Sequence, residues 1–91
     1  MMNNSTIHVR ITSPNQILYD GDALSISSTN SIGKFDILAA HANFITLIEN
    51  KQIIVRDLQK QTHSFTFPLA IIYTVKNTVN IYTYVQIQKQ I

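Results

Sequence analysis

Apolar and polar residues alternate with a two-residue period along most of the chain. The clearest case is the segment 7–12, which reads Ile-His-Val-Arg-Ile-Thr. Such alternation places one face of a β-strand against a core and the other face toward solvent. The pattern predicts nine strands, covering residues 7–12, 16–19, 23–27, 33–38, 44–48, 52–56, 62–67, 70–75 and 78–82.

Short polar segments that favour turns separate these predicted strands. Residues 20–22 read Asp-Gly-Asp and predict a tight turn, because glycine readily adopts a positive φ. Residues 76–77 read Lys-Asn and predict a two-residue hairpin in which the asparagine takes the left-handed conformation. Pro14 and Pro68 are expected between strands, because proline cannot donate a hydrogen bond within a sheet.

Short strands at a spacing of about ten residues are typical of a β-sandwich or barrel. The tail, residues 85–91, continues the alternation as either a last edge strand or frayed coil. We therefore expect an all-β fold, an about ten-stranded flattened β-sandwich or barrel, with no helix. The expected organisation is a flexible N-terminus (1–6), a β-sandwich domain (7–84) and a short C-terminal tail (85–91).

Composition narrows the possible functions. The chain has 91 residues and no cysteine, which excludes disulfides and thiol catalysis. The net charge is only +2 and the seven Lys and Arg residues are scattered, so we expect no nucleic-acid interface. No apolar run approaches the roughly 20 residues that span a bilayer, and the first residues lack the apolar region of a signal peptide. We therefore expect the protein to stay in the compartment where it is made.

The pattern of polar residues predicts no reaction site. Asp20 and Asp22 flank a predicted turn glycine, and a turn tip offers no pocket for acid–base chemistry. His8 and His63 lie on different predicted strands, without cysteine or a third ligand at metal spacing. We expect no catalytic residue, no cofactor and no metal ion. The segment 33–47, a strand, a sharp bend around His41 and a second strand, is instead expected to form a docking surface at one end of the fold.

Two spaced motifs give the chain a family resemblance. Residues 13–14 read Ser-Pro and residues 18–23 read Leu-Tyr-Asp-Gly-Asp-Ala. Residues 33–45 read Gly-Lys-Phe-Asp-Ile-Leu-Ala-Ala-His-Ala-Asn-Phe-Ile. With these motifs, residues 7–81 resemble the N-terminal β-sandwich domain of the epsilon subunit of the F-type ATP synthase, whose mitochondrial counterpart is the delta subunit. The family reads Leu-Tyr-Asp-Gly-Glu-Ala and Gly-Glu-Phe-Gly-Ile-Leu-Pro-Gly-His-Ala-Pro at the same places.

Several positions depart from the family pattern. Ala40 stands where the family has the glycine before its histidine, and Asn50-Lys51 replaces a Pro-Gly turn. Because these residues resist a positive φ more than glycine does, we expect the corners to be built differently. Lys34 also reverses the charge of the family's acidic residue. The family's C-terminal pair of helices has no counterpart here, which implies that its inhibitory arm is absent.

The resemblance implies a central-stalk rotor subunit, not an enzyme, that docks on the gamma subunit and the c-ring and couples ion flow to ATP synthesis. It places the protein peripherally on the cytoplasmic face of a bacterial cell membrane, or on an organelle inner membrane, held there only through the complex. The residues carried over as c-ring-facing are Gly33, Lys34 and Phe35, and those carried over as gamma-facing are Ser13, His41, Ala42 and Thr46.

Two other classes remain open. The first is a free-standing β-sandwich adaptor that kept the fold without the rotor role, which the lost glycines and the reversed charge at Lys34 favour. The second is a small enzyme or carbohydrate-binding module on a β scaffold. The absence of tryptophan and of paired carboxylates at one strand end disfavours this class.

Overall fold

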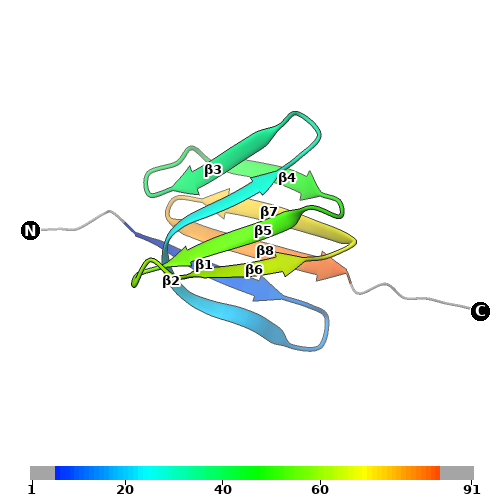
Figure 1. Ribbon diagram of the computed structural model, residues 1–91, viewed down its shortest axis with the longest axis horizontal. Coiled ribbons are helices and arrows are strands. Elements are labelled where there is room, and N and C mark those ends of the chain that lie inside the picture. Colours follow the sequence, from blue (N-terminus) through cyan, green and yellow to red (C-terminus); the bar gives the residue numbers. More distant parts are fainter. Residues whose placement is uncertain (1–5, 85–91) are drawn as a thin grey trace, which may run out of the picture.

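The computed structural model describes residues 6–84, and Figure 1 shows their arrangement. These residues form eight strands and no helix. The strands are β1 (Ile7–Thr12), β2 (Ile17–Thr29), β3 (Lys34–Leu38), β4 (Phe44–Ile48), β5 (Gln52–Asp57), β6 (Thr62–Thr66), β7 (Leu69–Val75) and β8 (Thr78–Tyr84). The all-β prediction is confirmed. The predicted flexible terminus up to residue 5 and the predicted tail 85–91 lie outside the described residues.

The long strand β2 connects two layers. Its first half pairs with β1, from Thr12↔Ile17 to Ile7↔Ala23, and its second half pairs with both β3 and β5. The first layer therefore runs β4-β7-β8-β1-β2, and the second runs β3-β2-β5-β6. In Figure 1, β5 and β6 lie in front of β1 and β8. A strand that changes layers at an irregularity is a common way to turn the corner of a sandwich, and the β2–β5 register shifts between Ala23 and Ser25.

Isoleucine and valine from both layers fill the space between them. The alternation of β1 is realised as predicted, because Ile7, Val9 and Ile11 are all buried. The other buried core side chains come from β2, β3, β4, β5, β7 and β8: Ala23, Ile26, Ile37, Ile48, Ile53, Val55, Ala70, Ile72, Val79 and Ile81. Each fully buried Ile or Val contributes about 1.5–3 kcal/mol relative to exposure, so this continuous core stabilises the fold.

Aromatic side chains close the two sides of the sandwich. On one side, the Tyr19 ring of β2 lies 5.5 Å from the His63 ring and 6.1 Å from the Phe65 ring, both on β6. On the other side, the Phe35 ring of β3 lies 5.4 Å from the Phe44 ring of β4. These centroid separations are in the range at which aromatic pairs attract each other beyond simple burial. The two layers are therefore joined at both margins as well as through β2.

The predicted turn at Asp20-Gly21-Asp22 is wrong, and so is the separation of β2 into two strands. Alternation continues through this segment, with Gly21 opposite Val9 and the two aspartates outward beside β1. Gly21 has no positive φ. The physical reason is cross-strand pairing: the His8 side chain bonds to both aspartates and keeps the segment extended. Merging these two predicted strands reduces the predicted nine to the eight observed.

The left-handed residues in the loops are not those expected. Ala40 has a φ of 65° and Asn50 a φ of 55°, so both keep a left-handed backbone without glycine. In the β7–β8 turn, Lys76 takes the left-handed conformation with a φ of 57°, which corrects the expectation for Asn77. Asparagine tolerates this region well, whereas alanine is strained there by roughly 1–2 kcal/mol.

Replacing each of the two glycines with alanine should change the stability of the protein in opposite directions. A Cβ at Gly21 would meet only Tyr19 ring atoms, at 3.8 and 3.9 Å, whereas Gly33 has a φ of 153° that L-residues rarely adopt. We expect Gly21→Ala to raise the free energy of unfolding by about 0.5 kcal/mol and Gly33→Ala to lower it by roughly 1–3 kcal/mol. Urea denaturation measures both, and a large loss in Gly21→Ala would mean that this segment is a turn after all.

Ala40 offers the converse test. Replacing it with glycine removes the steric strain of a left-handed alanine, and the backbone N–H of residue 40 keeps its bond to the Asn77 side chain (2.7 Å). We expect Ala40→Gly to raise the free energy of unfolding by about 1 kcal/mol. Ala39→Gly, next to it, has no left-handed backbone to relieve and serves as the control. Equal effects of the two changes in urea denaturation would contradict the strain at position 40.

Candidate docking surface

The outward side of the first layer carries large apolar side chains on three adjacent strands. Register places Ile45 opposite Tyr73, and Leu47 opposite Ile71, which in turn lies opposite Tyr82. Ile45 is 66% exposed, and Leu47, Tyr73 and Tyr82 are each 42–47% exposed. We call these five residues, from β4, β7 and β8, the apolar face. A contiguous exposed apolar patch on a small domain marks a surface that a partner covers.

A shallow depression lies at one edge of the apolar face. It has a volume of about 420 Å³ and is lined by Thr12, Ser13, Pro14, Ile71, Tyr82 and Thr83. Its wall is the β1–β2 turn, which is closed by a bond from Ser13 N–H to the Gln16 carbonyl (2.9 Å). The Thr83 hydroxyl donates to the Thr12 carbonyl (3.1 Å) and joins this turn to β8. These two hydrogen bonds hold the wall of the depression in place.

The remaining part of the same outward side, on β1 and β2, is charged. His8 Nδ1–H donates to Asp22 (2.8 Å) and Nε2–H donates to Asp20 (2.6 Å). The Arg10 guanidinium lies 3.7 Å from the second oxygen of Asp20. We call these four residues the histidine clamp. The bond to Asp22, and next the bond to Asp20, raises the pKa of His8 above its ordinary value of 6.5.

Neither the apolar face nor the histidine clamp was predicted from the sequence. Ile45 and Leu47 had a usable signal, because they occupy the face of their strand opposite to buried Ile48. No sequence pattern indicated the clamp, because the predicted turn placed Asp20 and Asp22 at a hairpin tip instead of beside His8.

The residues predicted to face gamma are only partly brought together. Ser13 lines the depression, whereas His41 and Ala42 lie in the β3–β4 loop. That loop is tied to the β7–β8 turn by the Asn77 side chain, and Lys76 N–H donates to the Asn43 side chain (3.1 Å). These loop residues are thus held beside the turn that joins β7 to β8.

Thr46 does not point outward. It alternates with the exposed Ile45 and Leu47, and its hydroxyl accepts a hydrogen bond from the Asn30 side-chain amide (3.0 Å). The same asparagine accepts bonds from the backbone N–H groups of Ile32 and Gly33 (2.9 and 3.1 Å). Thr46 therefore holds the β2–β3 loop in place, and its outward neighbours carry the apolar face.

The residues predicted to face the c-ring lie around this β2–β3 loop. Lys34 is exposed at the first position of β3, and Ile32 at the loop tip is 94% exposed. Phe35 instead points inward, against Phe44. Gly33 and Lys34 thus lie at one end of β3, and His41 follows the other end. The predicted gamma-facing residues do not form one region, because Ser13 and Thr46 lie in or beside strands of the first layer.

Among the remaining histidine and carboxylate side chains of the described residues, His63 and Asp57 form a pair rather than a metal-binding cluster. Within 6–84, no group of three or more His, Asp or Glu residues could hold a metal ion. His63 bonds to Asp57 (2.8 Å) and lowers the pKa of that carboxyl group. Asp57 also accepts the backbone N–H groups of Gln59 and Gln61, so this pair closes the β5–β6 loop. No helix among these residues is long and apolar enough to cross a membrane.

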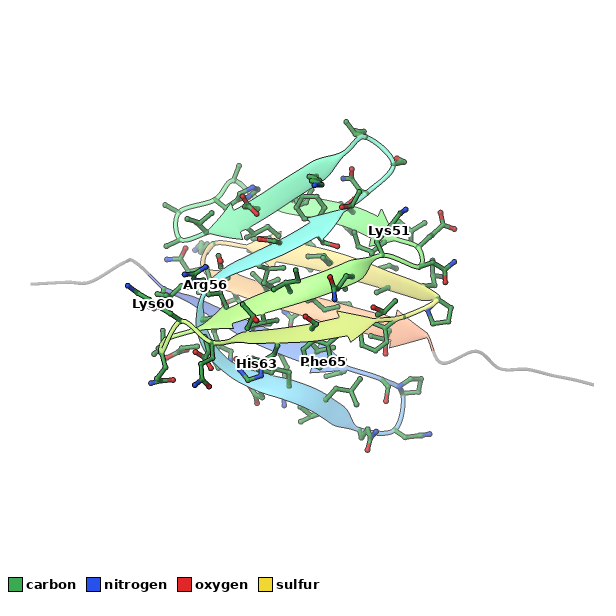
Figure 2. All side chains as sticks on the ribbon, viewed as in Figure 1. Lys51, Arg56, Lys60, His63 and Phe65 are labelled. Atoms are coloured by element: carbon green, nitrogen blue, oxygen red, sulfur yellow. The ribbon has the colours of Figure 1, made fainter. Side chains whose placement is uncertain are left out.

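The exposed cations of the second layer are dispersed. Figure 2 shows Arg56 and Lys60 near the β5–β6 turn and Lys51 at the opposite end of β5. His63 and Phe65, labelled on β6, are the residues that pack against Tyr19. The second layer therefore presents separated charges, and the first layer presents the apolar face.

The comparisons with known proteins agree with this architecture. The family model of the ATP synthase delta/epsilon chain, beta-sandwich domain, matches residues 6–88. The chain belongs to this family. The predicted resemblance and the β-sandwich fold are thereby confirmed.

Relatives of this delta/epsilon-family chain include an ATP synthase epsilon chain of Sulfurimonas denitrificans, 37% identical over 60 residues. The match covers 66% of this chain and 44% of that relative, so this chain spans about half of the relative's length.

Two solved structures share the fold. A chain of the Euglena gracilis mitochondrial ATP synthase superposes with a TM-score of 0.80 at 14% identity, covering 87% of this chain and 51% of that one. A chain of the central stalk and c-ring structure of the Tetrahymena thermophila mitochondrial ATP synthase gives 0.69 at 12% identity, covering 86% and 63%. At these identities the likeness concerns the fold alone.

The histidine clamp predicts a pH-dependent stability. Because the folded-state pKa of His8 is raised, its contribution is fully present below about pH 6.5 and is lost as the pH rises through the raised value. We expect the urea midpoint to fall between about pH 6 and about pH 9, and His8→Gln to reduce this fall. His63→Gln is the matched control. An unchanged pH profile in His8→Gln would contradict the clamp.

Proposed function

We propose that this protein is a central-stalk rotor subunit of a proton-translocating F-type ATP synthase, which docks on the gamma subunit and the c-ring. Family membership supports this role, as do the names of the relatives. In this role the subunit has no catalytic residue and needs no cofactor. It reaches the membrane only through the complex, on the cytoplasmic face of a bacterial cell membrane.

The observation that carries the proposal is the apolar face. Ile45, Leu47 and Tyr73 are held in solvent by strands whose other sides are buried, so they cannot turn inward without breaking the β4–β7 register. We assign the gamma subunit to this face, with the depression beside Ser13 receiving an apolar side chain. A buried apolar centre with a polar rim is the usual anatomy of a stable protein interface.

Stiffness is the second physical requirement for a rotor part. Torque must pass through the subunit without shearing its layers, and close-packed interiors transmit strain well. Here β2 belongs to both layers, and Asn77 joins three elements: its carbonyl accepts His8 N–H (2.8 Å) at the start of β1, and its side chain accepts Ala40 N–H from the β3–β4 loop. These connections favour a rigid link over a hinged one.

The contact with the c-ring is assigned to Gly33 and Lys34, with Phe35 holding their strand against the core. Asn30 bonds the β2–β3 loop at three points, so the exposed side chains of Ile32 and Lys34 are presented on a defined loop. Their chemistry fits a partner loop with an apolar recess and a carboxylate. An exposed ion pair of this kind contributes about 0–1 kcal/mol, so the apolar contact is expected to matter more.

The alternative, a free-standing adaptor without the rotor role, loses part of its support. It rested partly on the missing glycines, yet Ala40 keeps a left-handed backbone at a position where the family has glycine. Lys34 still favours the adaptor, and the binding experiments below distinguish the two functions.

Two leucines of similar exposure provide a matched test of gamma docking. Leu47 lies on the apolar face and is 47% exposed, whereas Leu58 lies in the β5–β6 loop and is 45% exposed. We expect Leu47→Asp to weaken binding to the gamma subunit from the same source at least about tenfold, because a carboxylate would be buried in the interface. Leu58→Asp should bind as the unmodified chain does.

The assay is calorimetric titration of the full chain with purified gamma, with circular dichroism to confirm folding. Equal affinities of the two leucine variants would contradict gamma docking on the apolar face. Absence of binding by the folded, unmodified chain would remove the rotor role and leave the adaptor.

The contact with the c-ring has its own test. We expect Lys34→Glu to weaken capture by the detergent-purified c-ring about two- to fivefold while leaving gamma binding unchanged, because Lys34 lies in the second layer, away from the apolar face. Lys60→Glu, at the opposite end of that layer, is the matched control. If both lysine variants behave alike on the c-ring, Lys34 is not at this contact.

A further inference from the structure

The histidine clamp holds an imidazole by both ring nitrogens. A neutral imidazole carries one N–H group, so it can donate only one hydrogen bond and must accept at its other nitrogen. The carboxylates of Asp20 and Asp22 can only accept, at 2.6 and 2.8 Å. With both aspartates ionised, both bonds form only when His8 is protonated, and loss of the proton leaves one carboxylate without its bond to His8.

Within residues 6–84, the charged groups that the structure places around His8 are those of the clamp. β1 lies between β2 and β8 in the sheet. β2 contributes Asp20 and Asp22, β1 itself contributes Arg10, and β8 places the uncharged Thr78 opposite His8. With His8 protonated, two cations balance two carboxylates. Deprotonation leaves the cluster with a net charge of −1 and one carboxylate without its bond to His8.

The clamp lies on the same outward side of the first layer as the apolar face. Register links Ile45 to Tyr73, Tyr73 to Asn80 on β8, and Asn80 to Arg10 on β1. Only β8 separates the clamp strands from Tyr73, a distance of about 10 Å at the usual strand spacing. A partner that covers the apolar face and extends over one or two strands more covers the clamp.

We propose that the histidine clamp is the polar half of the gamma-docking surface and makes docking depend on proton uptake. This inference rests on the proposed function. When a partner removes water, a balanced cluster with every hydrogen bond made is tolerated, whereas a cluster with an unpaired carboxylate is strongly disfavoured. The docked state therefore holds the His8 proton more tightly than the free chain does, and docking takes up a proton when the free chain is deprotonated.

The proposal also specifies the chemistry of the partner. Because the protonated clamp is already neutral, the opposing surface needs no compensating charge. It should be apolar opposite the apolar face and uncharged polar opposite the clamp. A basic surface would compete with His8 for the aspartates and would favour its neutral form instead.

The experiment measures the dissociation constant of the full chain for purified gamma from about pH 6 to about pH 9. Linkage of one proton limits the change to tenfold per pH unit, and we expect the dissociation constant to increase by up to this amount above the pKa of His8 in the free chain. His8→Gln keeps a donor and an acceptor without titrating, so its profile should be flat. Asp22→Asn leaves Arg10 and Asp20 balanced without the His8 proton, so its profile should be flat as well.

His63→Gln is the matched control, because it changes a histidine on β6 in the other layer and should keep the unmodified profile. Titration of the His8 ring by proton NMR in the free chain locates the pKa independently of gamma. Binding that is equally tight across the pH range, or a His8→Gln profile like that of the unmodified chain, would overturn the clamp proposal and leave gamma docking intact. Absence of binding at every pH would overturn both.

Discussion

The rest of the structure depends on the continuity of β2 through both layers. Thirteen residues pair first with β1 and then with β3 and β5, so neither layer can move without bending a strand that the other layer holds. The aromatic contacts of Tyr19 and Phe35 hold the two layers at a fixed distance from each other along both margins. A small domain has a modest core, and this shared strand lets about 80 described residues behave as one body.

The shared strand also decides where function can lie. Because the inner faces of both layers are buried in the core, only the outer faces and the loop ends are available to partners. The first layer presents Ile45, Leu47 and Tyr73 outward on neighbouring strands, whereas the second layer presents separated cations together with the exposed apolar side chains of Ile32 and Leu38. The adjacent exposed apolar side chains therefore lie on the first layer.

Side-chain hydrogen bonds support the loops on either side of β3. Ala40 keeps a left-handed backbone beside its bond to Asn77, and Asn30 fixes the loop before Gly33 by three bonds. The strain at Ala40 is about the size of a single hydrogen bond's net contribution, so a well-bonded loop can retain it.

The sequence by itself determined the all-β class, most strand positions, the buried faces and the family. These follow from local periodicity and from motifs that are contiguous in the chain. Only the tertiary structure showed that Asp20-Gly21-Asp22 is extended strand and not a turn, because this conformation depends on pairing with His8 and its neighbours on β1. It likewise decided the apolar face, since register must first bring Ile45, Tyr73 and Tyr82 together from three strands. Pairing between distant segments has no local signature, and this is why the apolar face could not be predicted from the chain alone.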